Sequence, residues 1–178
     1  MSKKTQAKSN TDGLGDRLKN FVESMAFADV FPRTLLASHN PNYDVRRNPN
    51  LESYSRFNWV VSGPEFLTPE NLPEGAQIQY LYRFVFSTET TIARTTEAGA
   101  VPEGQSIPEE HQIGTIHAQF VVEYLSAINP DQVEDKVLEI FQKKLVAFHA
   151  WNFWRELLSN LALRARLPVP SLPSFPNV

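Results

Sequence analysis

Two stretches of the chain alternate strictly in side-chain character, and this alternation limits the secondary structure that they can form. In QIQYLYRFVFSTETTI, large apolar side chains occupy every second position from Ile78 to Phe86. In IGTIHAQFVVEYLS, the same pattern runs from Ile116 to Tyr124. Successive side chains of a β-strand point to opposite faces of a sheet, so the pattern predicts two long strands. The long polar connection between them favours an antiparallel pair.

Two earlier segments predict further strands. From Phe27 onwards the residues are β-branched and aromatic, and Pro32 within this run indicates an edge strand or a bulge. Residues 54–62 form another short strand, with Trp59 and Val61 set against Phe57 and Val60. The following segment, GPEFLTPENLPEG, is rich in proline and glycine and is interpreted as a surface loop that presents Phe66 and Leu67.

From Asn129 the period of the apolar residues changes from 2 to 3.6, which predicts helices. Asn129 is suited to cap a helix and Pro130 to its first position. The apolar stripe of this helix is Val133, Val137, Ile140, Phe141 and Leu145. A last helix carries Trp151, Trp154, Leu158, Leu161 and Ala165 before prolines end it. The order predicts an α+β fold: an antiparallel four-stranded sheet followed by two C-terminal helices packed on one side.

The length of 178 residues predicts one domain over residues 15–173, preceded by a polar, disordered tail at 1–14 and followed by a tail at 174–178. The net charge of −3 argues against nucleic acid as a partner. The absence of cysteine excludes disulfides and thiolate chemistry. No signal peptide and no apolar run long enough for a membrane span are found, so a cytoplasmic protein without membrane insertion is expected.

The residues that usually carry catalysis are scattered. The four histidines, at 39, 111, 117 and 149, do not have metal-ligand spacing. The glycines of DGLGD follow no strand and lack a phosphate-binding lysine. We therefore expect no enzyme activity, no cofactor and no metal.

The C-terminal third resembles the SecB and SecB-like export chaperones. The strand TIHAQFVVEYL is followed by an Asn-Pro linker, an amphipathic helix, the aromatic junction FHAWNFWRELLSNLALR and the extended segment LPVPSLP. An aromatic-Arg-Glu element that begins the last helix of the family is matched by Phe153, Trp154, Arg155 and Glu156. The basic residue and Leu-Pro segment that follow it are matched by Arg164, Leu167, Pro168, Leu172 and Pro173. Asn152 stands where many relatives have proline, and outside residues 115–173 the match is one of topology.

The resemblance implies a homotetramer, built as a dimer of dimers and without ATPase activity. Such a protein holds unfolded polypeptides in long apolar grooves. It then passes them to a SecA-type translocase or guards a dedicated client such as an antitoxin, and the sequence leaves both roles open.

The strands are apolar on both faces, and helices on one side can cover only one of them. An uncovered apolar face implies self-association or a client, whereas the alternative is burial of both faces within one domain. The predicted client contacts are Trp59, Val61, Phe66, Leu67, Leu81, Val85, Phe141, Leu145 and Leu163. The predicted subunit contacts are Leu81, Arg83, Val85, Val121, Arg155 and Glu156.

Two other functions fit the same pattern. A small-ligand-binding α+β domain would enclose an aromatic pocket around Tyr80, Tyr82, Phe84 and Trp151. A non-catalytic assembly protein would use the same apolar surfaces for permanent subunit contacts. An ATP-independent holdase remains the preferred interpretation.

Overall fold

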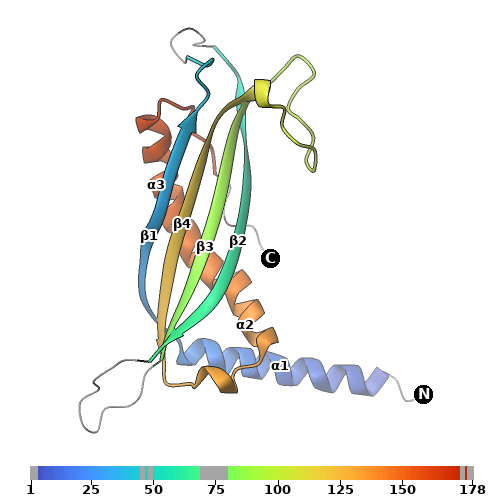
Figure 1. The fold of residues 1–178 in the computed structure, drawn as a ribbon. Coiled ribbons are helices and arrows are strands. Elements are labelled where there is room, and N and C mark those ends of the chain that lie inside the picture. Colours follow the sequence, from blue (N-terminus) through green and yellow to red (C-terminus); the bar gives the residue numbers. More distant parts are fainter. Residues whose placement is uncertain (1–3, 45–46, 48–49, 69–79, 173–174, 176–178) are drawn as a thin grey trace.

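The computed structural model describes residues 4–44, 47, 50–68, 80–172 and 175. Helix α1 (Lys4–Ser24) precedes four strands, which are β1 (Ala26–His39), β2 (Ser53–Leu67), β3 (Tyr80–Arg94) and β4 (Gln112–Ser126). The chain ends in α2 (Asp135–Phe141), a π-helical segment (Gln142–Val146) and α3 (Ala147–Arg164). One antiparallel sheet with helices on one side confirms the predicted fold class (Figure 1).

The strands lie in the order β1-β4-β3-β2, so the two alternating segments form the centre of the sheet. Phe84 lies opposite Val122 and Phe86 lies opposite Phe120, which confirms the predicted antiparallel pair. Ile78 lies outside the described residues. Because side chains directly opposite each other share a face, the alternation places the large apolar side chains of both central strands on the same side.

The two edge strands are irregular. In β1, the register shifts between Phe27 and Asp29 and between Pro32 and Thr34, as expected for a proline confined to an edge. In β2, the register shifts between Ser62 and Glu65, around Gly63, whose φ is 106°. A Cβ at that glycine would lie 2.9 Å from the carbonyl oxygen of Arg83, so only glycine fits here.

This bulge lets β2 continue to its end at Leu67. Phe66 and Leu67 pair with Tyr82 and Leu81, so the prediction that they belong to a loop is wrong. The glycine and proline in this segment mark a bulge in a strand, which the composition alone does not separate from a loop. The register also places Phe57 on the same face as Trp59 and Val61, not opposite them; Val60 alone of this set faces the other way.

The two predicted C-terminal helices form one helical run with a π-helical segment between them. Asn129 caps a 3-10 turn over residues 130–132, with its Oδ1 accepting from the amide of Asp131 at 3.0 Å. The α-helix itself begins later, at Asp135. At the other end of the chain, α1 is helical from Lys4, within the segment that the sequence analysis assigns to a disordered tail.

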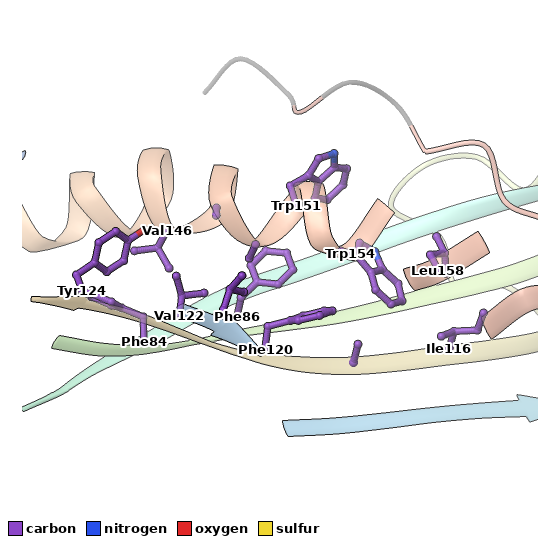
Figure 2. Close-up of a cluster of buried hydrophobic side chains, with 14 of the residues drawn as sticks. Phe84, Phe86, Ile116, Phe120, Val122, Tyr124, Val146, Trp151, Trp154 and Leu158 are labelled. Carbon is purple, nitrogen blue, oxygen red and sulfur yellow. The ribbon is translucent and has the colours of Figure 1, made fainter. Parts of the chain in front are cut away.

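The core lies between the sheet and the helical run. Trp154 and Leu158 are fully buried, and Figure 2 shows both pointing from α3 onto the strands. Phe21 of α1 closes the lower end of this core with ring contacts to Tyr82 and Phe141 at 5.9 and 5.2 Å. Aromatic rings from α1, β3, β4 and α2 therefore fill the space that the helices cover.

Candidate functional site

The other face of the sheet is open. In Figure 1 the helical run α2–α3 passes behind the sheet, and no described helix crosses the face turned to the viewer. The register arranges the side chains of this open face into rows that run across all four strands. One apolar row consists of Ala26, Leu125, Leu81 and Leu67, and a second contains Phe31, Val121 and Val85.

Apolar side chains on the open face remain accessible. Leu36 and Val60 are 57% and 60% exposed, and Phe31 and Leu67 are exposed as well. Leu81 and Val85 are partly buried, whereas Val121, between Phe31 and Val85, is only 4% exposed. A single subunit therefore leaves apolar side chains of the open face, among them Phe31 and Leu67 of the two rows, in contact with water, and covering them would be favourable by about 25 cal/mol per Å².

A charged row separates the two apolar rows. It consists of Asp29, Glu123, Arg83 and Glu65. Arg83 binds Glu123 through two nitrogens, with Nη2 at 2.7 Å and Nε at 2.8 Å from the same carboxylate oxygen. Three carboxylates against one guanidinium leave this row with a formal net charge of −2, so an identical copy facing it directly would bring like charges together.

A second surface lies along the edge of β2, on the helix side, and we name it the β2-edge groove. It has a volume of about 450 Å³. Its lining comes from the edge strand, the loop after β3 and α3: Tyr54, Ser55, Arg56, Phe57, Trp59, Val101, Glu103 and Trp151.

The wall of the β2-edge groove is fixed by Arg56. Its Nη2 donates to the carbonyl oxygens of Val101 and Pro102 at 2.9 and 3.0 Å, and its Nη1 donates to the carbonyl oxygen of Gln105. The hydroxyl of Tyr54 accepts from the amide of Val101 at 3.2 Å. The planar, multidentate guanidinium thereby holds the loop backbone against the strand at this side of the groove.

The predicted client contacts are divided between these surfaces. Trp59 lies in the β2-edge groove, partly buried and stacked on Phe86 at 6.0 Å. Val61 is the next residue on that face, and Phe66 follows with its ring 5.1 Å from that of Tyr82. Leu67, Leu81 and Val85 lie on the open face.

The helical members of the predicted set differ among themselves. Phe141 is 0% exposed and packed among Phe21, Phe84 and Tyr124, so the prediction of a client contact there is not compatible with the structure. Its apolar spacing is that of a core position, which sequence alone does not distinguish from a groove. Leu145 is partly buried in the π-helical segment. Leu163 is 64% exposed on α3.

The predicted subunit contacts do not form one patch. Leu81, Arg83, Val85 and Val121 lie together on the open face. Arg155 and Glu156 are exposed on α3, which packs on the opposite face, and line a separate hollow of about 470 Å³ with residues 170–172. A subunit interface that used both sets would need two different surfaces of the chain.

Two tyrosine hydroxyls on the helix side of the sheet are hydrogen-bonded within the domain. The hydroxyl of Tyr82 donates to the carbonyl of Ile128 at 2.9 Å, and burial, helped by the neighbouring Tyr80, raises the pKa of Tyr82 to about 12. Burial likewise raises the pKa of Tyr124 and lowers that of His149, whose Nδ1 lies 2.7 Å from the Tyr124 hydroxyl.

Among the described residues no group of three potential metal ligands occurs. None of the described helices is long and apolar enough to cross a membrane.

The space of the alternative small-ligand pocket is filled. Tyr82 and Phe84 are fully buried, and Phe84 makes ring contacts with Tyr124 and Phe141 at 5.9 and 5.7 Å. Tyr80 is partly buried, at the start of β3. This packing gives the aromatic-pocket hypothesis no support.

Several accessible apolar residues were not identified from the sequence as candidates. Phe27, Phe31, Leu36, Phe148 and Val60 are exposed, and Phe175, assigned to a tail, packs against the domain. The edge position of β1 could have indicated the exposure of its residues. Nothing in the sequence indicates that Phe175 returns to the domain.

Comparisons with known proteins support the fold. No protein-family model matches the chain, and no curated protein matches it in sequence. The structure is similar to that of the SecB-like chaperone Rv1957 of Mycobacterium tuberculosis, solved in complex with a ChAD peptide from the HigA1 antitoxin. The TM-score is 0.58, with 13% identity, over 92% of this chain and 99% of that chain. The chain therefore shares the fold of a SecB-like chaperone over nearly its full length.

Proposed function

We propose that this protein is an ATP-independent chaperone that holds non-native polypeptide segments on its apolar surfaces. The observation that carries the proposal is that apolar side chains remain exposed although the core of the domain is complete. The fold is shared with a chaperone that was solved with a bound peptide. Large exposed apolar patches are typical of surfaces that bind other polypeptides. The β2-edge groove and the open face are the two candidate surfaces for this binding.

The two surfaces suit different parts of an extended client. The β2-edge groove offers aromatic rings at the edge of a sheet, where backbone groups of an edge strand are available for pairing. The open face offers apolar rows separated by a charged row, which favours contact with an extended client whose apolar side chains alternate with polar ones. The client contacts that we propose on the open face are Leu67, Leu81 and Val85. Those that we propose on the helix side are Trp59, Val61 and Phe66.

The decisive experiment is suppression of aggregation. A chemically denatured test protein is diluted into buffer with and without the chaperone, in the absence of ATP, and light scattering is followed. We expect scattering to fall to a low plateau at a stoichiometric ratio. Unchanged scattering at a tenfold excess of the protein would refute the proposed function.

We further propose a homotetramer as the working form. Size-exclusion chromatography with light scattering should give about four times the subunit mass of 20.2 kDa. Retention of the protein on an immobilised SecA-type motor would assign it to export. Binding of one endogenous polypeptide without that motor would assign it to a dedicated client.

A further inference from the structure

The C-terminal segment places an aromatic ring on the helix side of the domain. The ring of Phe175 lies 5.8 Å from that of Trp151, 5.9 Å from that of Phe148 and 6.2 Å from that of Trp59, measured between centroids. These three rings come from α3 and β2, so Phe175 bridges the helix and the edge strand. Two of its contacts, Trp59 and Trp151, also line the β2-edge groove.

The chain that follows α3 returns along that helix, because residues 170–172 line a hollow together with Asn152, Arg155 and Ser159 of α3. The chain turns after the helix at Arg166, which has a φ of 55°, and Leu167 is buried while its amide donates to the carbonyl of Ala162 at 2.9 Å. From residue 164 to residue 148 the helix rises about 24 Å, and any eight residues in a polyproline-type conformation would span about 25 Å. The length of the segment thus matches the distance back to Phe148.

Phe175 contributes to the burial of Trp151 through the contact between their rings. Figure 2 shows Trp154 pointing onto the sheet, whereas the Trp151 indole leaves the helix in a different direction. Trp151 is nevertheless only 2% exposed. One aromatic side chain, supplied by a segment that follows the last helix, covers a surface that the sheet and helices leave apolar.

We infer that Trp59, Phe148 and Trp151 form a docking site for a single aromatic side chain on an extended chain, and that Phe175 is its intramolecular occupant. The inference rests on the proposed function, because a client segment with such a side chain would compete with Phe175 for the site. The C-terminal segment then sets the affinity threshold that a client must exceed.

The size of this effect follows from tethering. A short flexible tether gives an effective concentration of about 1 mM. A segment with an intrinsic Kd of about 0.1–1 mM would lower the apparent affinity of a competing ligand by about 2- to 10-fold.

The test uses the chain's own C-terminal sequence as a probe. A fluorescein-labelled peptide of residues 167–178, LPVPSLPSFPNV, is titrated with full-length protein and followed by fluorescence anisotropy. We expect the Phe175→Ala protein to bind it about 2- to 10-fold more tightly than the wild type. Trp59→Ala introduced into the Phe175→Ala protein should remove this binding. Phe153→Ala, which deletes an exposed ring of α3 elsewhere, should match the wild type.

A peptide that itself carries Phe175→Ala is the matched probe and should not bind. Equal affinities of wild-type and Phe175→Ala proteins, or equal binding of the two peptides, would overturn the inference. Suppression of aggregation by the wild type in that case leaves the proposed function standing. Peptide binding in the predicted pattern by a protein that suppresses no aggregation would instead refute the chaperone function and retain the docking site.

Discussion

The two faces of the sheet are built from the same strands but differ in how far their side chains are covered. On the helix side, Phe84, Phe86 and Phe120 are almost completely buried under α2 and α3. On the open side, their sequence neighbours Val85 and Val121 form an apolar row next to a row of charged residues. The first face closes a core within one chain, whereas the second keeps apolar and charged side chains together at the surface.

This difference separates stability from recognition. A side chain surrounded on all sides contributes through both its removal from water and its packing, so its loss leaves a cavity. A partly exposed side chain on the open face, such as Val85, contributes to stability mainly through its immediate neighbours and retains surface for another polypeptide. Substitutions on adjacent residues of one strand can therefore separate folding from binding.

The largest effect is expected for Phe84→Ala on the covered face. The change removes ring contacts with Tyr124 and Phe141 and leaves a cavity, at a cost of about 3–5 kcal/mol in the free energy of unfolding. Urea denaturation followed by tryptophan fluorescence measures it. Val85→Ala, one residue further on the open face, is the control and should cost less than half as much. Equal losses at both positions would remove the distinction between the faces.

Leu81→Asp and Val85→Asp should affect association more than folding. Both side chains are partly buried in the apolar rows, so we expect a loss of about 1–2 kcal/mol in stability together with loss of the oligomer or of aggregation suppression. Light scattering and the aggregation assay measure the two outcomes. Ser87→Asp, on the same face of the same strand, is the matched charge control and should retain both the oligomer and the suppression of aggregation. Complete unfolding of the Leu81 and Val85 variants would instead place both residues in the core.

The sequence predicted the central sheet well because alternation depends only on the geometry of a strand. It predicted the paired central strands, the edge position of Pro32 and the burial of Trp154 and Leu158. It misassigned Phe66, because a strand with a bulge at Gly63 has the composition of a loop. The prediction of a client contact at Phe141 fails for a different reason. Apolar periodicity shows which side of a helix faces inward, but it does not show whether another chain can also reach that side.

The Arg83–Glu123 pair tests how the open face tolerates its charged row. Arg83→Met leaves Glu123, whose side chain is only 14% exposed, without its two charge-assisted hydrogen bonds, and should cost about 1–2 kcal/mol. Glu123→Gln alone should cost a similar amount. The double variant should recover part of the sum, with a coupling energy of about 1 kcal/mol by urea denaturation. Full additivity would show that the pair contributes nothing beyond its separate side chains.

The smallest effect belongs to the polar contact on the covered side, His149 with Tyr124. Burial lowers the pKa of His149 from its usual 6.5, so its ring stays neutral in the folded chain at pH values where the unfolded chain already binds a proton. Because the unfolded state then holds more protons, the free energy of unfolding should fall as the pH decreases from about 6.5 through the folded pKa, with a slope below one proton. The physical cause is the burial of the ring beside the Tyr124 hydroxyl, 2.7 Å from its Nδ1, because burial penalises the charged form of the imidazole. Urea denaturation between pH 5 and 8 measures the slope, and His149→Gln should flatten it; the same slope in that variant would assign the dependence to other groups.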